Sequence, residues 1–309
     1  MKRIGFIGVG AMGAPMAERL LSAGYDLTVY DPSEKATASL RQAGAATAPS
    51  PLEAASGRDV VFACLPNQEV SRKVALGPGG IVDAKNVGAY VEMSTIGSAT
   101  VADIAGGLAK AGIRVLDAPV SGGPRGARGG TLTMIVAGPE DVVAHCREPM
   151  QAIAGNLFHV GDRPGQAQVA KLANNMISAA GMVASFEAVT MGVKAGLSAD
   201  TLIDLINVST GRCGATLDKF PQSILTRSFD YGGKLGTMYK DVILCLEEYR
   251  GRGVPHHVSS GVAQIWFQGM AQGRGDDDYT SLIKIIEDWA GVEVRGKAAD
   301  LQPASGDEA

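Results

Sequence analysis

The chain has 309 residues, of which 46% are hydrophobic and 19% charged, and its formal net charge is −4 at pH 7. This length allows one large or two medium domains with a buried core, and the composition is that of a soluble cytoplasmic protein. The sequence shows no clustered basic face for nucleic acid, and no apolar run reaches the roughly 18 residues that a membrane span needs. The four cysteines lie too far apart to suggest disulfides or a metal site.

Short apolar runs alternate with amphipathic segments over residues 2–160. This alternation is typical of βαβ units with a parallel sheet. We expect helices at 15–23, 34–42, 69–74, 100–111 and 139–150. We expect strands at 4–7, 27–30, 60–64, 89–93, 115–116, 132–137 and 157–160.

The pattern changes after Gly165. Residues 166–196 lack proline and are rich in helix formers, which predicts one long helix with Gly196 as its C-cap. Further helices are expected at 199–208, 234–250, 257–271 and 278–290. The predicted fold is therefore an α/β Rossmann-type N-terminal domain (1–163) and an all-α C-terminal domain (164–292) joined by the long helix, followed by a polar, disordered tail (293–309).

A glycine-rich turn, GFIGVGAMG, joins the first strand to the first helix. Gly8 would permit a tight turn, Gly10 would let a pyrophosphate approach the backbone, and Gly13 would let the helix pack closely on the strand. Ala11 and Met12 complete the turn, and the N–H groups at the start of the helix would face the phosphates. A glycine-rich turn without a ligand is the alternative.

Asp31 ends the next predicted strand, LTVYD, eighteen residues after Gly13. A carboxylate at this place can accept hydrogen bonds from the adenosine ribose hydroxyls and would repel a 2′-phosphate. No arginine follows it closely, so the sequence favours NAD over NADP as cofactor. The alternative is that Asp31 merely caps a turn or a helix.

Three further stretches could carry chemistry. Residues 122–130 hold five glycines next to a strand, and such a loop can bring backbone N–H groups to an anion or can simply be a flexible connection. Lys171 and Asn175 are four residues apart in the long helix and share one face. Lys240 opens an apolar helix, where Lys240–Asp241 could equally be a surface helix start.

Several of these stretches carry a family resemblance. GFIGVGAMGAPMA, CLP at 64–66, MSTI at 93–96, DAPVSGGPRGARGGTL, GQAQVAKLANN and KDVILCLE occur in order and span about 290 residues. The chain resembles the β-hydroxyacid dehydrogenase family, which includes 3-hydroxyisobutyrate dehydrogenase and tartronate semialdehyde reductase. The resemblance implies hydride transfer between a nicotinamide and the C3 alcohol or semialdehyde of a small hydroxy acid.

The resemblance also assigns residues. Lys171 would be the general acid/base, and Asn175 would hold the substrate and orient that lysine. Substrate-binding residues are expected at Ser121, Gly122, Gly123 and, beside Asn175, at Asn174. Further cofactor-binding residues are expected at Leu65, Pro66, Thr95 and Lys240.

Substrate, partners and competing functions stay open at this point. Arg212 lies in a segment where family members vary, so it could meet a second acidic group of the substrate or be a surface arginine in a loop. An imine reductase is disfavoured because such relatives usually lack the lysine at position 171, and a non-catalytic member is disfavoured by the presence of both Lys171 and Asn175. A 6-phosphogluconate dehydrogenase would carry a much larger helical domain. The family commonly assembles through its helical domains, which predicts a homodimer or homotetramer.

Overall fold

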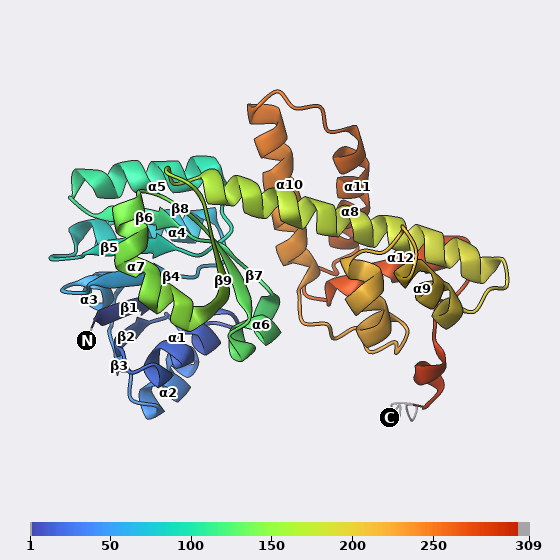
Figure 1. Ribbon diagram of the computed structural model, residues 1–309, viewed down its shortest axis with the longest axis horizontal. Helices are drawn as coiled ribbons and strands as arrows, with labels where there is room; N and C mark the ends of the chain where they lie inside the picture. The colour runs from blue at the N-terminus through green and yellow to red at the C-terminus, as the bar shows by residue number, and fades with distance from the viewer. Residues whose placement is uncertain (1, 302–309) are drawn as a thin grey trace. The chain divides into compact units, whose positions relative to one another are not determined.

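The computed structural model describes residues 2–301 (Figure 1). It consists of two compact units, the first ending at Leu172 and the second beginning at Ala173. Helix α8 (Gln166–Lys194) starts in the first unit and continues in the second, so the division falls inside this helix. The expected architecture of a Rossmann-type domain, a long helix and a helical domain is confirmed.

The first unit is built on one sheet. The strands are β1 (Arg3–Ile7), β2 (Asp26–Tyr30), β3 (Ala46–Thr47), β4 (Val60–Ala63), β5 (Ala89–Glu92), β6 (Arg114–Asp117), β7 (Val120–Ser121), β8 (Leu132–Ala137) and β9 (Ala154–Gly161). Their order is β3-β2-β1-β4-β5-β6-β8-β7, with β9 beside β8. The strands from β3 to β6 pair in parallel, and the order reverses at β1 and β4, where ligands of such sheets commonly bind.

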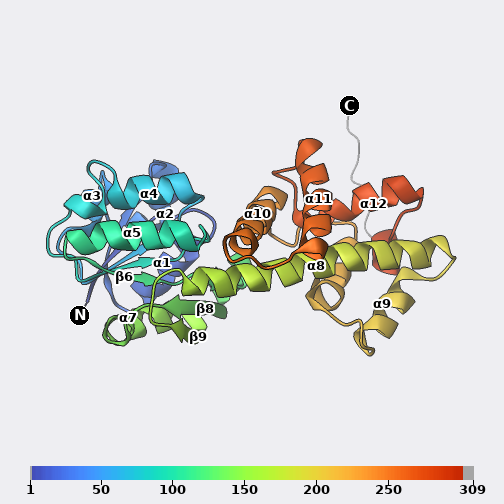
Figure 2. The same ribbon diagram turned by 90° about the horizontal axis from the view of Figure 1, so that it is seen from above.

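Helices cover both faces of this sheet (Figure 2). One face carries α1 (Gly13–Ser22), α2 (Glu34–Gln42), α6 (Gly123–Gly129) and α7 (Glu140–Ile153). The other carries α3 (Pro51–Ala55), α4 (Gln68–Leu76), η1 (Ile81–Asp83) and α5 (Ser98–Lys110). Successive strand residues face opposite cores, as Phe6 and Ile7 do in β1, which explains why the strands read as unbroken apolar runs.

The predicted strands and helices of residues 4–160 are all present, with ends shifted by a few residues. Five short elements were missed, namely β3, α3, η1, β7 and α6. The expectation that residues 122–130 form only a glycine-rich loop was wrong, because 123–129 form helix α6. Glycine disfavours helix, so the glycine-rich composition of this segment did not predict one.

The second unit is helical. After α8 come α9 (Ala199–Asn207), the π-helix η2 (Ala215–Ile224), α10 (Leu235–Gly251), α11 (His257–Ala271), η3 (Tyr279–Leu282), α12 (Ile283–Ala290) and η4 (Lys297–Leu301). The predicted helices are confirmed, although the segment 278–290 is divided into η3 and α12. The sequence analysis missed η2, which contains Pro221 and follows a glycine-containing turn, both of which normally argue against a helix.

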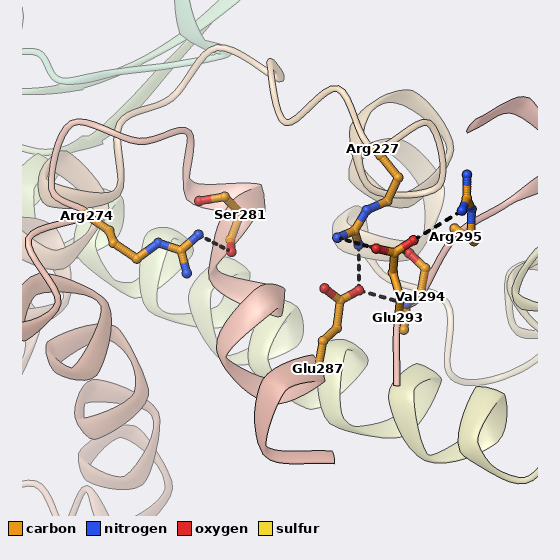
Figure 3. Close-up of polar contacts among 7 residues, drawn as sticks. All are labelled: Arg227, Arg274, Ser281, Glu287, Glu293, Val294 and Arg295. Carbon is orange, nitrogen blue, oxygen red and sulfur yellow. Dashed lines mark hydrogen bonds and ion pairs between the residues drawn. The ribbon is translucent and has the colours of Figure 1, made fainter. Parts of the chain in front are cut away.

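The chain that follows α12 is tied to the second unit by Arg227 (Figure 3). Arg227 donates to Glu287 Oε1 at 2.6 Å and to the Val294 carbonyl at 3.1 Å, and its guanidinium lies 3.6 Å from Glu293 Oε2. The Val294 side chain is fully buried. The disorder expected from residue 293 onward is therefore wrong for 293–301, while residues 302–309 lie outside the described part of the chain.

Helix α8 is unusually apolar. Its best 18-residue window has a mean hydropathy of 1.5, so by length and composition it could span a membrane, which the search for uninterrupted apolar runs did not anticipate. Half of that window is buried inside the protein, as in the core helix of a soluble domain. Lys171, Glu187 and Lys194 also interrupt the helix, so its composition is weak evidence for a membrane segment.

Candidate functional site

The glycine turn after β1 has the geometry that the sequence predicts. Gly8 has φ +85°, and a Cβ there would lie 2.3 Å from the Cys64 carbonyl oxygen. A Cβ on Gly13 would lie 1.9 Å from the Gly8 carbonyl oxygen, so α1 can begin this close to the turn only without a side chain. Both glycines are therefore required by the fold of the turn itself.

Gly10 differs from the other two glycines. It is exposed, and a Cβ placed on it would meet no atom within 4 Å. No side chain caps the N-terminus of α1, and the first turn of this helix has no acidic residue. The open backbone at Gly10, Ala11 and Met12 thus faces an uncapped helix N-terminus, an arrangement that suits a pyrophosphate group.

Asp31 is held beside this turn. Its Oδ2 accepts a hydrogen bond from the Val9 N–H at 3.0 Å, and its Oδ1 accepts one from the Ser33 N–H at 2.9 Å. The two bonds fix the carboxylate at the carboxyl end of β2 while leaving lone pairs on both oxygens. Asp31 therefore stabilises a turn, as the alternative interpretation held, and its carboxylate is fixed beside the glycine turn.

The ends of β4 and β5 meet the same turn. Leu65 Cδ2 lies 3.0 Å from the position of a Cβ on Gly8, and the Leu65 N–H donates to Ser94 Oγ at 2.7 Å. Thr95 follows Ser94 and is half-buried, whereas Pro66 is exposed. Leu65 and the Ser94–Thr95 corner are therefore joined at the point where the strand order reverses.

Ser121, Gly122 and Gly123 connect β7 to α6. Gly122 has φ +125° and Gly123 has φ +61°, values that side-chain-bearing residues adopt only with strain. Gly122 is the N-cap of α6, with no side chain capping the helix, and both glycines are exposed. The backbone here is open to an anion such as a carboxylate, with Ser121 supplying a hydroxyl beside it.

A buried hydrogen-bond network fixes the beginning of α8. Gln168 is fully buried. Its Oε1 accepts hydrogen bonds from the Ile96 and Gly97 N–H groups at 2.8 and 3.0 Å. Its Nε2 donates to the Ser94 carbonyl at 3.0 Å and to Asp117 Oδ1 at 2.7 Å. Asp117 Oδ2 accepts from the N–H groups of Gly165 and Gln168 at 2.9 and 3.0 Å. The first turn of α8 is thus attached to the ends of β5 and β6.

Two carboxyl groups of this region are buried and face each other across the sheet. Glu92 and Asp117 are paired in the register of β5 and β6, and neither is exposed. Burial raises the pKa of Glu92 to about 7, although hydrogen bonds from Ser94 and Tyr90 oppose the shift, and Asp117 raises it further. Burial also raises the pKa of Asp117 to about 6, against hydrogen bonds from Gln168.

A second network holds α8 on the other side of Lys171. Asn175 Nδ2 donates to Asp241 Oδ2 at 2.7 Å, and Asn174 Nδ2 donates to Asn175 Oδ1 at 3.1 Å. Asp241 Oδ1 lies 3.0 Å from Lys240 Nζ. Asp241 is only 6% exposed, so the reading of Lys240–Asp241 as a surface helix start is wrong.

Lys171 is buried in α8, three residues after Gln168 and four before Asn175, so one helical turn separates it from each anchored side chain. The sequence analysis singled out Lys171 and Asn175 but missed the residues that hold them. Asp241 was considered only as part of a possible surface helix start, and Gln168 and Asp117 were not considered. The spacing of Gln168 from Lys171 on one helix face could have revealed the first of these.

Other candidates take no part in these networks. Arg212 is exposed in the turn before η2. No three His, Cys, Asp or Glu side chains among residues 2–301 gather in a way that could hold a metal ion. The cysteines of this part of the chain form no disulfide bond.

Two family profiles match the chain. Residues 3–161 match one described as the NAD binding domain of 6-phosphogluconate dehydrogenase. Residues 165–286 match one described as the NAD-binding region of NADP-dependent 3-hydroxyisobutyrate dehydrogenase. Together they cover the two parts of the chain that the sequence analysis separated.

Individual relatives match over nearly the whole length. A 2-(hydroxymethyl)glutarate dehydrogenase of Eubacterium barkeri is 35% identical, over 95% of this chain and 98% of the relative. An NAD-dependent L-serine dehydrogenase of Pseudomonas aeruginosa is 34% identical, over 93% and 98%. The solved structure of a Mycobacterium tuberculosis 3-hydroxyisobutyrate dehydrogenase with L-serine superposes with a TM-score of 0.85 at 31% identity, over 93% of this chain and 99% of that one.

Proposed function

Because the chain belongs to the β-hydroxyacid dehydrogenase family, we propose that it is an NAD-dependent oxidoreductase of small 3-hydroxy acids, with Lys171 as the general acid/base. The placement of Lys171 carries this proposal. The lysine is 6% exposed and lies one turn from Gln168 on one side and from Asn175 on the other, and both of these side chains are fixed by hydrogen bonds.

NAD fits the residues of the first unit. The open backbone of Gly8, Gly10 and Gly13 would hold the pyrophosphate at the start of α1, and the fixed carboxylate of Asp31 would accept the ribose hydroxyls and repel a 2′-phosphate. Leu65, Pro66 and Thr95 of the same unit would line the rest of the cofactor, and the family resemblance adds Lys240 of the second unit. When bound, the nicotinamide supplies or accepts the hydride.

The protein's part in the chemistry is proton transfer and positioning. In the oxidation direction the Lys171 amine takes the proton of the substrate hydroxyl, and in the reduction direction the Lys171 ammonium returns a proton to the carbonyl oxygen. Asn175 orients the substrate and the lysine, and its own amide is fixed because Nδ2 is bonded to Asp241. Ser121, Gly122 and Gly123 would bind the substrate carboxylate through a hydroxyl and backbone N–H groups, with Asn174 as a further polar contact.

The competing functions are weaker for physical reasons. An imine reductase or a non-catalytic relative would have no need of a buried lysine placed between two anchored turns of one helix. Burying a lysine is costly, so the arrangement would be a burden on stability without a function. The substrate class of small hydroxy acids or their semialdehydes is the one named for the relatives, among them 2-(hydroxymethyl)glutarate and L-serine.

The proposal includes assembly as a homodimer or homotetramer. Ile177, Ala184 and Met191 recur every seven residues along α8 and are exposed, Ile177 at 74% and Met191 at 70%. Trp289 of α12 is 61% exposed, and Met191 and Ile286 line a hollow of about 460 Å³ together with the charged residues Glu187 and Lys194. Exposed apolar side chains gathered in this way are typical of a protein interface, so we assign the apolar face of α8 to a second copy and not to a membrane.

The test is a spectrophotometric screen at about 340 nm with NAD and with NADP. The panel holds 3-hydroxyisobutyrate, glycerate, serine, 3-hydroxypropionate and 2-(hydroxymethyl)glutarate, with semialdehydes for the reverse reaction. We expect NAD-linked turnover of at least one acid, and we expect Lys171→Ala to lower kcat by about 10²–10⁴-fold while NADH binding, followed by fluorescence, is kept. Lys110→Ala, which changes an exposed lysine of helix α5, is the control.

Either of two outcomes would contradict the proposal. The first is the absence of NAD- or NADP-linked turnover with every compound of the panel, in a protein that still binds NADH. The second is turnover by Lys171→Ala within tenfold of the wild type.

A further inference from the structure

Lys219 is a buried cation in the second unit. It lies in η2 and is only 7% exposed. Its Nζ donates to the Gly214 carbonyl at 3.4 Å and lies 5.2 Å from the centroid of the Tyr231 ring. None of the ion pairs formed within residues 2–301 includes Lys219.

This lack of a carboxylate partner sets Lys219 apart from two other shielded cations of the same unit. Lys240 pairs with Asp241, and Arg227 pairs with Glu287. A buried charge is normally paired, because an unpaired one loses its hydration without compensation. Burial accordingly lowers the pKa of Lys219, although Asp218 and Cys213 act in the opposite direction.

The space next to the Lys219 ammonium is open on the side of Gly214. Gly214 is exposed, and a Cβ placed on it would meet only Lys219 Nζ, at 3.8 Å. Its φ of −61° and ψ of −22° are helical, so the backbone does not require glycine there. The missing side chain therefore leaves room beside the ammonium that a larger residue would fill.

This region adjoins the helix that carries the proposed catalytic residues. Cys213, next to Gly214, places its Sγ 3.5 Å from Ser185 Oγ and 4.0 Å from the Gly181 carbonyl, both on α8. Gly181 follows Asn175 by six residues, which is about 9 Å along the helix. A substrate held at Asn175 would reach this region by extending about 9 Å along α8 and about 120° around it, because six residues turn an α-helix by about 600°.

We propose that Lys219 binds a second acidic group of the substrate, and that the enzyme therefore prefers hydroxy acids with an additional carboxylate. The inference rests on the proposed function, because it takes Asn175 as the place where the substrate is held. Arg212, which the sequence analysis considered for this role, is exposed, whereas Lys219 is buried and unpaired. A carboxylate would gain more from the buried ammonium than from the solvated guanidinium.

The test measures binding without turnover. Glutarate, a dicarboxylate, and butyrate, its monocarboxylate counterpart, are titrated calorimetrically into the enzyme–NADH complex. We expect wild-type protein to bind glutarate at least tenfold more tightly than butyrate, and Lys219→Met to remove that preference. Lys284→Met is the matched control, because Lys284 is a half-buried lysine lying 4.1 Å from the centroid of the Phe229 ring; it should keep the preference. Equal binding of the two acids by the wild type, or a preference that survives Lys219→Met, would overturn the inference.

A second variant keeps the charge and fills the space. Gly214→Val should weaken glutarate binding about tenfold or more, with little change in the thermal unfolding midpoint. This variant provides the test if Lys219→Met does not fold, and unchanged glutarate binding would count against the inference.

The proposed function can fail independently of this inference. A tight glutarate site in a protein that turns over no hydroxy acid would leave Lys219 as an anion site and overturn the enzyme activity, whereas turnover of hydroxy acids without any glutarate preference would overturn only the role of Lys219.

Discussion

Asp31 illustrates how one side chain can serve the fold and, in the proposed function, the cofactor as well. Its two oxygens accept hydrogen bonds from Val9 and Ser33, which fixes the carboxylate next to the glycine turn. Replacing Asp31 with Ala should therefore lower the preference for NAD over NADP, expressed as the ratio of the two kcat/KM values, by about tenfold or more, because a hydrogen bond to a charged group contributes about 1.5–3 kcal/mol. Asp26→Ala, at the start of the same strand, is the control. An unchanged ratio in Asp31→Ala would show that the ribose is bound elsewhere.

Glu92 gives a prediction about pH. Its folded pKa of about 7 lies above the ordinary value of 4.5, so the folded protein holds this proton more tightly than the unfolded chain does. The free energy of unfolding should therefore fall as the pH rises from about 4.5 to about 7, by up to about 3 kcal/mol from this group. Asp117, with a pKa of about 6, acts in the same direction.

Glu92→Gln removes the ionisable group but keeps an acceptor for the Ser94 N–H. Compared with the wild type, this variant should gain about 2–3 kcal/mol of stability between pH 5 and pH 8, measured by urea unfolding at each pH. Glu18→Gln, an exposed site on α1, should show no such gain. A difference between variant and wild type that is the same at both pH values would mean that Glu92 is not neutral at low pH in the folded protein.

At the scale of elements, the beginning of α8 depends on Gln168. Gln168→Leu would remove four hydrogen bonds and leave an Asp117 oxygen without its amide partner. We expect kcat to fall about 10–100-fold while NADH affinity changes little, because a displacement of about 1 Å at Lys171, the proposed general acid/base, is enough for such a loss. The control is Gln166→Leu, two residues earlier in the helix, where the side chain bonds only to the Arg163 N–H. Equal kcat values in the two folded variants would show that Gln168 does not position Lys171.

The elements also show what the sequence could and could not predict. The strand, glycine turn and helix around Gly8 were predictable, because each glycine does a local task that its spacing reveals. Helix α6 and the π-helix η2 were not, because glycine and proline normally interrupt helices and only tertiary packing overrides them here. The burial of Asp241 and Lys219 was hidden for a related reason: burial of a charged residue depends on the elements that surround it and not on its neighbours in the chain.

At the scale of the whole chain, each unit contains proposed functional residues of its own. The first unit contains the glycine turn, Asp31 and the network of Gln168, and the second contains Asn175 with Asp241. Helix α8 is the one continuous element that contains residues of both units and that carries Lys171. The same helix also exposes an apolar face, so catalysis and assembly are proposed to use different faces of one element.

This apolar face gives the last prediction. Ile177, Ala184 and Met191 recur with the seven-residue spacing of helices that pair along a seam, and a charged residue inserted there would have to be buried without a partner. The double variant Ile177→Glu/Met191→Glu should therefore change the mass measured by light scattering from an oligomer to a monomer, at protein concentrations where the wild type stays assembled. Val208→Glu, at a site that is 89% exposed just after α9, is the control and should leave the mass unchanged. A wild-type protein with the mass of a single chain would refute assembly altogether, whereas an oligomer that persists in the double variant would place the interface on another face of the molecule.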